Sequence, residues 1–181
     1  MIDNELFTFV KSAIDQGLAA RSVANVKVKR KFQRMQQGAE SGAVVYLFKV
    51  GDKRVGSPRK ADKWNAQTLK MDHTESQTFE TTIQASVMVD EDPANVAQLT
   101  ASDLANIVCD IMQGDDGLAV LRAGKVGVLR VGAVSNPYAV DDRSQYAASP
   151  SFDFVLTYRR ARVSNVPELK TIDSRTGVYR V

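Results

Sequence analysis

The chain has 181 residues, of which 44% are hydrophobic and 25% charged, values typical of one globular domain that buries roughly 70% of its unfolded surface. Lys and Arg outnumber Asp and Glu by only 24 to 21, so net charge alone does not argue for nucleic-acid binding. A single cysteine and a single histidine exclude an intrachain disulfide and metal sites that need several of either.

The N-terminal segment predicts an amphipathic helix over residues 3 to 18, with Asp3 available as N-cap. Its apolar residues recur at three- and four-residue spacing: Leu6, Phe9, Val10, Ala13, Ile14 and Leu18. Acidic residues precede them, the reverse of a signal peptide's basic start, and no apolar run approaches the roughly 18 residues of a membrane span. We expect a protein made in the cytoplasm that does not contact a membrane.

The next segment predicts a strand with one basic face, because Val26, Val28 and Phe32 alternate with lysines. No acid occurs between residues 21 and 39. A solvated sheet face is the simpler explanation, and the functional one is a positive surface beside DNA or an acidic partner. The candidate contact residues are Lys27, Lys29, Arg30, Lys31 and Arg34.

The middle of the chain predicts further strands and an arm. Residues 43 to 48 are continuously apolar, as in a central strand, and Gly51-Asp52 predicts a turn into a short return strand. Residues 57 to 73 follow neither the helical nor the strand period and carry Lys, Arg and one Trp. We interpret them as a long exposed arm, which compact domains usually keep for a purpose. Residues 79 to 89 alternate clearly and predict a half-buried strand.

In the second half, Thr100 or Ser102 caps a second helix that Gly114 ends. A short helical turn at 118 to 121, a strand from Val126, a last strand from 152 to about 163 and a polar tail follow. This order favours an α+β fold with a mostly antiparallel sheet, two helices packed on one face, an extended hairpin arm and a C-terminal tail. We expect a single domain over residues 1–163 that includes the arm 57–73, followed by the tail 164–181.

Residues that could carry chemistry are better explained by structure. His73 has no second histidine or nucleophile nearby and is expected on the surface of the arm. Cys109 lies beside an apolar stripe and next to Asp110, as a small hydrophobe would. The acidic pairs fall at turns or helix starts and lack calcium-loop spacing. We therefore predict no catalytic, cofactor-binding or metal-binding residues, no cofactor and no enzymatic activity.

Two blocks of the sequence, residues 72 to 89 and 126 to 158, resemble the tail-terminator or gateway (neck) protein family of contractile long-tailed bacteriophages. The most specific pieces are Asn136-Pro137-Tyr138, Asp142-Arg143 and Pro150-Ser151-Phe152-Asp153-Phe154. The resemblance implies a compact α+β subunit that forms a hexameric ring on the head-proximal end of the tail tube. It also implies contacts with tube, sheath and neck proteins, and passage of DNA without sequence specificity.

We therefore expect a structural virion protein of the tail and neck junction. Its candidate contacts with neighbouring subunits, neck or sheath are Lys53, Arg54, Arg59, Lys60, Lys63, Trp64, Asp141, Asp142 and Arg143. The first alternative is a small nucleic-acid-binding module that uses the basic strand and binds free duplex with a steep salt dependence. The second is a metal-dependent hydrolase that would lose its activity when Asp141 and Asp142 become Asn. Ring stoichiometry, and the choice between a terminator and an adjacent neck ring, stay open.

Overall fold

The structure is a computed structural model that describes residues 2–31, 42–90, 94–95, 97–140 and 146–166. Its helices are α1 (Asp3–Ala20), α2 (Ala101–Gln113) and α3 (Asp115–Ala123). Its strands are β1 (Val26–Arg30), β2 (Ala43–Asn65), β3 (Lys70–Met88), β4 (Val126–Val131), β5 (Tyr138–Val140), β6 (Tyr146–Ala148) and β7 (Ser151–Val166).

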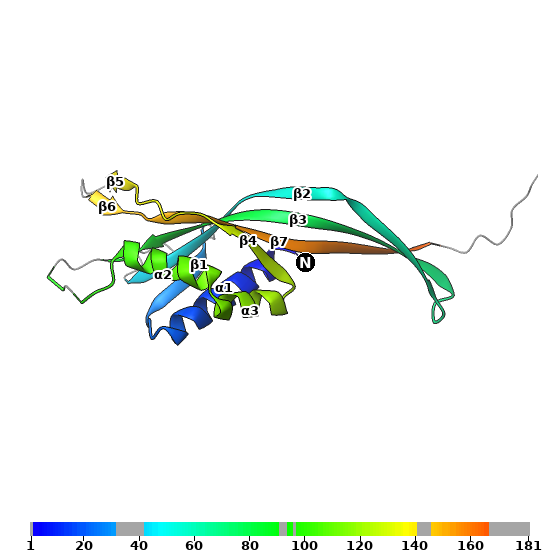
Figure 1. Cartoon of the computed structure of the whole chain (residues 1–181), viewed down its shortest axis with the longest axis horizontal. Coiled ribbons are helices and arrows are strands. Elements are labelled where there is room, and N and C mark those ends of the chain that lie inside the picture. The colour runs from blue at the N-terminus through cyan, green and yellow to red at the C-terminus, as the bar shows by residue number, and fades with distance from the viewer. Residues whose placement is uncertain (1, 32–41, 91–93, 96, 141–145, 167–181) are drawn as a thin grey trace, which may run out of the picture.

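Five of these strands form one sheet in the order β1-β2-β3-β7-β4. The pairs β2–β3, β3–β7 and β7–β4 are antiparallel, whereas β1 runs parallel to β2. All three helices lie on one side of this sheet (Figure 1). The predicted α+β class with a mostly antiparallel sheet is therefore confirmed. We call the side of the sheet that carries the helices the helix-side face and the opposite side the outer face.

The core lies between the helices and the helix-side face. Both predicted helix stripes are buried there, with Leu6 and Val10 of α1 and Leu104 and Ile111 of α2 at most 1% exposed. Phe9 and Ile107 pack against this core from its rim. Alternate residues of the strands complete it: Val28, Val45, Leu47, Ile83, Ala85, Val87, Phe152, Phe154 and Leu156. The period of two that the sequence shows in β3 is thus the period of burial.

The β2–β3 hairpin is much longer than the helices that cover it. It extends beyond α1 and α3 as an arm with β7 alongside, and the tip bends toward the helix side (Figure 1). β3 and β7 stay in register from Met71↔Val166 to Ser86↔Ser151 without a shift. β2 is less regular, with register shifts between Lys49/Gly51 and between Val55/Arg59.

Four features differ from the expectations. The chain does not turn at Gly51-Asp52, because β2 continues through a bulge there, where a glycine is easily accommodated. A complete third helix, α3, replaces the expected single turn. β7 continues to Val166, past the expected start of the tail. Residues 167–181 lie outside the described residues.

The fourth difference is the start of α1. Asp3 is the first helical residue and Ile2 occupies the N-cap position, where Glu5 Oε2 accepts a hydrogen bond from Ile2 N at 2.8 Å. The second helix begins as predicted, since Thr100 Oγ1 accepts from Asp103 N at 3.1 Å. The N-terminal Asp3 is thereby left free to bond elsewhere in the fold.

Candidate functional site

The predicted basic strand is β1, and its cations point to both faces of the sheet. Lys27 is exposed on the outer face, while Val28 between the lysines is 5% exposed on the helix-side face. Arg30 lies on the helix side, where its guanidinium carbon is 4.1 Å from the ring centroid of Phe7. Its Nη1 also donates to Asn4 Oδ1 at 2.7 Å. Arg30 therefore attaches the strand to α1, a role that the strand pattern does not reveal.

The other members of that set are placed differently. Lys29 is half-buried and belongs to the outer face with Lys27, because both alternate with Val28. Lys31 follows the strand, is exposed, and donates its backbone N–H to Leu47 O at 2.8 Å. Arg34 lies outside the described residues.

The predicted arm residues lie along β2 beyond the helices. Lys53 Nζ is 3.7 Å from Glu80 Oε2, and Lys60 Nζ is 3.5 Å from Glu75 Oε1. These pairs are solvent-exposed and contribute little stability. The other predicted residues on this segment, Arg54, Arg59, Lys63 and Trp64, are also exposed, and Trp64 retains 45% of its surface. Asp141, Asp142 and Arg143 lie outside the described residues.

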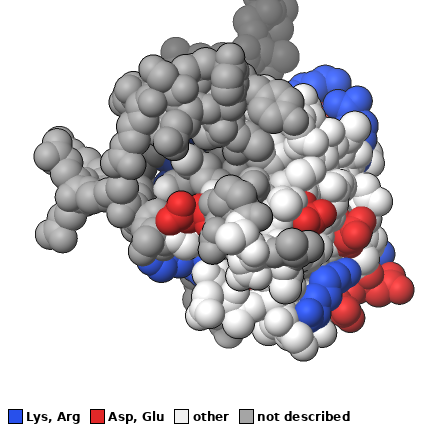
Figure 2. All heavy atoms as spheres, turned by 90° about the vertical axis from the view of Figure 1, so that its left-hand side faces the viewer, with Lys and Arg blue, Asp and Glu red and all other residues white. Residues whose placement is uncertain are grey.

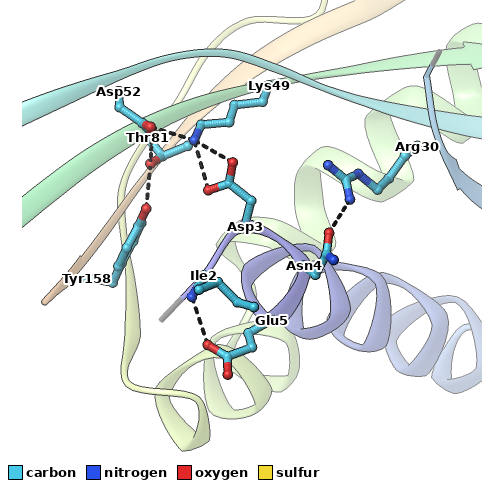
Figure 3. Close-up of polar contacts among 9 residues, drawn as sticks. All are labelled: Ile2, Asp3, Asn4, Glu5, Arg30, Lys49, Asp52, Thr81 and Tyr158. Carbon is cyan, nitrogen blue, oxygen red and sulfur yellow. Dashed lines mark hydrogen bonds and ion pairs between the residues drawn. The ribbon is translucent and has the colours of Figure 1, made fainter. Parts of the chain in front are cut away.

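A polar network fixes the root of the arm to α1 (Figure 3). Lys49 Nζ lies 3.0 Å from both carboxylate oxygens of Asp3 and also pairs with Asp52. Thr81 Oγ1 donates to Asp52 Oδ1 at 2.6 Å. Because that donation uses the only hydroxyl hydrogen of Thr81, the 3.3 Å contact with Tyr158 must have the tyrosine O–H as donor. The network thus joins α1, β2, β3 and β7.

The charges in this network reinforce one another. Burial alone would lower the pKa of Lys49, but hydrogen bonds to Asp52 and Asp3 outweigh it and raise that pKa above its usual 10.5. Burial alone would raise the pKa of Asp52, but hydrogen bonds from Lys49 and Thr81 and the charge of Arg160 lower it below 3.8. Both groups therefore stay charged around neutral pH.

Next to this network, an aromatic side chain lies between two arginines, a grouping that sequence reasoning missed. The Phe79 ring stacks with that of Tyr158 at a centroid distance of 6.0 Å. The guanidinium carbons of Arg54 and Arg160 lie 5.8 and 5.3 Å from the Phe79 centroid. Both distances fall within the reach of cation–π attraction. Only the pairing of the strands brings this group together, because Arg54, Phe79 and Tyr158 are cross-strand neighbours. No local pattern in the sequence indicates it.

The same surface continues outward as a shallow hollow of about 420 Å³. Its lining consists of Arg54, Pro58, Glu75, Ser76, Gln77, Phe79, Arg160, Ala161 and Arg162. Gln77 Nε2 donates to the carbonyls of Val55 and Gly56 at 2.8 and 2.7 Å, which satisfies the backbone where β2 shifts register. Pro58 lies in that shift, a position where its missing N–H costs no ladder bond.

His73 is on the arm, as expected, but it is not isolated. Its Nδ1 lies 2.5 Å from Asp62 Oδ1 across the β2–β3 pair, and its Nε2 lies 3.5 Å from Glu75 Oε1. Hydrogen bonds to Asp62 and then to Glu75 raise the pKa of His73 above 6.5. Hydrogen bonding from His73 and the charge of Lys60 lower the pKa of Glu75. His73 therefore links the two strands near the tip of the arm through its contact with Asp62.

The remaining candidate groups are the cysteine and the acidic residues. Burial and the neighbouring Asp110 raise the pKa of the Cys109 thiol, which keeps it in the less reactive protonated form. Within the described residues, no three His, Cys, Asp or Glu side chains converge as a metal site would require. In the same part of the chain, no helix combines the length and apolar character needed to cross a membrane.

The outer face of the sheet carries apolar groups beside its charges. Leu129 is 58% exposed and Met88 51% exposed. A shallow hollow of about 630 Å³ lies on this face, lined by Gly51, Asp52, Lys53, Glu80, Thr82, Leu129, Arg130 and Val155. It borders two of the three register shifts of the sheet, the bulge of β2 near Gly51 and the shift of β4 between Val128/Arg130.

Comparison with known proteins identifies one matching family. Residues 5–168 match the model of the family described as E217 gateway protein gp29. Among solved structures, the chain is similar to the PVC sheath/tube terminator of an extracellular contractile injection system in its extended state, determined by cryo-EM. The two share 11% sequence identity with a TM-score of 0.47, and the match covers 96% of this chain but only 65% of the other. No curated protein matches the sequence significantly.

Proposed function

The chain belongs to the E217 gateway protein family, and from this membership we propose that it is a structural virion protein of a contractile-tailed bacteriophage. It caps the head-proximal end of the tail tube and sheath as a ring and joins the tail to the neck. The family match carries this proposal, because residues 5–168 include every strand and nearly all of the three helices. The protein acts by binding, without a catalytic step or a cofactor.

The ring is a homo-oligomer, with six copies as its proposed size. A closed ring of identical subunits needs two different surfaces that fit each other. The fold supports this arrangement because its sheet extends well past its own helices (Figure 1). The arm residues Arg59, Lys60, Lys63 and Trp64 are exposed there and are proposed contacts with a neighbouring subunit, the neck or the sheath. A tryptophan that stays 45% exposed is a typical anchor of a protein interface.

The outer face of the sheet offers a second contact surface. Leu129 gives the hollow on this face an apolar side chain, and Lys53, Glu80 and Arg130 surround it, while Met88 is exposed elsewhere on the same face. Apolar groups within a charged rim suit a tube, sheath or neck protein better than they suit DNA. We assign the lysines at the β1 end of this face, Lys27 and Lys29, to the DNA in the lumen or to an acidic partner.

The test is a phage that lacks the protein. We expect tails of irregular length or heads without tails, and rescue when the full chain is supplied in trans. Electron microscopy of tails carrying tagged protein should place a ring of density at the upper end of the tail. Tails of normal length joined to heads in the absence of the protein would contradict the proposal.

The nucleic-acid-binding alternative makes a separate prediction. It requires the purified protein to bind free duplex DNA, with an affinity that falls steeply as salt increases. Binding of that kind together with normal tails in the deletion phage would favour the alternative. Binding that is equally weak with and without Lys27→Glu would argue against it.

A further inference from the structure

The part of the sheet beyond the helices presents a helix-side face that no helix of the same chain covers. We define this distal sheet as residues 52–80 of β2 and β3 together with residues 157–166 of β7. Its helix-side face begins where the helices stop, since Thr81 and Leu156 are fully buried and Tyr158 is 4% exposed, whereas Phe79 is partly open and Arg160 is exposed. Phe79, Arg54 and Arg160 come next along this face. The side of the sheet that the helices cover in the body of the fold is thus left open in the arm (Figure 1).

The distal sheet is also basic. It contains nine Lys and Arg against five Asp and Glu. On the helix-side face, the carboxylate of Glu75 is already engaged by His73 and Lys60. Arg54 and Arg162 face the hollow of about 420 Å³, and no described carboxylate forms an ion pair with either of them. This face therefore offers guanidinium groups beside an aromatic ring, a combination that suits carboxylates on a folded partner.

The helix layer has the opposite charge. Residues 101–123, which form α2 and α3, contain four Asp and only one Arg. Asp110, Asp115 and Asp116 are exposed around the junction of these helices, and none of them forms an ion pair with a described residue. Arg21, whose side chain reaches the junction at Gly114, donates to Gly17 O at 3.2 Å. The carboxylates of the junction are thus available to a partner.

The two charged surfaces belong to different regions of an elongated molecule. In Figure 1 the helices lie under one half of the sheet and the arm extends away from them. Figure 2, which views the end opposite the arm, shows both acidic and basic groups among uncharged atoms. Within one chain the basic face therefore cannot lie on the acidic helices. Two copies arranged head to tail can satisfy both surfaces at once.

We propose that the helix-side face of the distal sheet binds the α2–α3 junction of a second copy of this chain, with Arg54 and Arg162 opposite Asp110 and Asp116. The proposal deepens the ring described above and rests on it for the oligomeric state. It specifies the interface: the sheet of one copy continues over the helices of the next, and cross-subunit ion pairs set the direction of the ring. The same contact repeats at every subunit, so the ring needs no other protein to define its polarity.

The experiment is a charge swap in the full-length protein, followed by sedimentation velocity at salt concentrations between roughly 0.05 and 0.5 M. Arg54→Glu/Arg162→Glu should weaken self-association at least about tenfold, and so should Asp110→Lys/Asp116→Lys. The chain that carries all four changes should assemble nearly as well as the unmodified protein. Arg159→Glu is the matched control, because its Cα partner Thr78 places it on the outer face of the same strand.

Folding can be checked independently. Asp110 lies in the last turn of α2, where a lysine suits the helix dipole better than an aspartate, so Asp110→Lys should not unfold the helix. Circular dichroism of each variant confirms the fold. If the Asp110→Lys variant is folded but self-associates more weakly, the loss of self-association arises at the interface and not from unfolding.

The outcomes separate this proposal from the function above. If Arg54→Glu/Arg162→Glu leaves self-association unchanged, the proposed interface is wrong, but the proposed ring is not contradicted. Weakening that the four-change chain does not restore overturns the choice of partner surface. A protein that stays monomeric at low salt overturns the self-association proposed here, whereas the role in the tail is decided by the deletion phage.

Discussion

The hydroxyl of Thr81 offers the sharpest test of the network at the arm root. Thr81 is fully buried and connects Asp52 to Tyr158, so Thr81→Val keeps the volume and removes the only group that joins them. A hydrogen bond to a charged group is worth about 1.5–3 kcal/mol. Since the Asp52 side chain is 31% exposed, water replaces part of that interaction. We expect Thr81→Val to lower the free energy of unfolding by about 2 kcal/mol.

Urea titration with matched variants measures this cost. The Tyr158–Thr81 contact is long at 3.3 Å, so Tyr158→Phe should cost only about 0.5–1 kcal/mol. The double variant should cost less than the sum, because each change removes the same bond. Thr82→Val is the control, since Thr82 lies on the outer face and should change stability by less than about 0.5 kcal/mol. In a thermal scan, Thr81→Val should lower Tm by roughly 4–8 °C.

The pH dependence gives a second readout of the same variant. The pKa of Asp52 is lowered in the folded state, so its contribution to stability is present above 3.8 and is lost as the pH falls through the folded pKa. Thr81 is one of the groups that hold this pKa down. The deficit of Thr81→Val should therefore be largest near neutral pH and shrink in acid. A deficit below about 0.5 kcal/mol at neutral pH, or a larger cost for Tyr158→Phe, would refute the reasoning.

Two other changes test separate parts of the fold. Gly117→Ala would place a Cβ 2.1 Å from the backbone oxygen of Ile111, so we expect a loss of roughly 1–3 kcal/mol despite the better helix propensity of alanine; an unchanged or raised Tm would contradict this. His73 is the only histidine, so one imidazole NMR signal reports its titration directly. We expect a pKa above 6.5 that moves back toward that value in Asp62→Asn. Because the pKa of His73 is raised in the folded state, its stabilisation of the fold is present below pH 6.5 and is lost as the pH rises through the folded pKa. A signal that titrates at or below pH 6.5 in the unmodified protein would exclude this stabilisation.

The sequence predicts those elements whose burial follows a simple period. Leu6, Val10, Leu104 and Ile111 repeat at helical spacing because one side of each helix faces the sheet. The half-buried strand β3 alternates for the equivalent reason. Side chains at these positions are selected by burial, so their pattern is visible without a structure.

The arm shows where this reasoning stops. Residues 51–64 of β2 are exposed on both sides, so no alternation marks them as a strand. Gly51 therefore predicted a turn, although in the structure it lies in a bulge within a continuous strand. The pairing with β3 is what makes this segment a strand, and pairing between distant residues leaves no local signal.

The candidate site depends even more on register. Arg54, Phe79 and Arg160 are far apart in sequence and meet only because three strands align there. The sequence predicts Arg54 as a contact candidate, but it indicates for Phe79 only a place in a half-buried strand. Likewise, Arg30 was grouped with the lysines of β1, although it packs on Phe7 from the helix side.

The uninterrupted register between β3 and β7 has a mechanical consequence. Antiparallel hydrogen bonds run perpendicular to their strands, so a pull along the arm that slides β3 against β7 loads the whole ladder in shear at once. β2 shifts register twice along the same length, so its bonds are divided into shorter groups that can yield separately. Tension applied at the tip is therefore carried into the body chiefly by the β3–β7 pair. The arm therefore resists stretching along β3 and β7, and it deforms more easily along β2, where the register shifts divide the hydrogen bonds into groups.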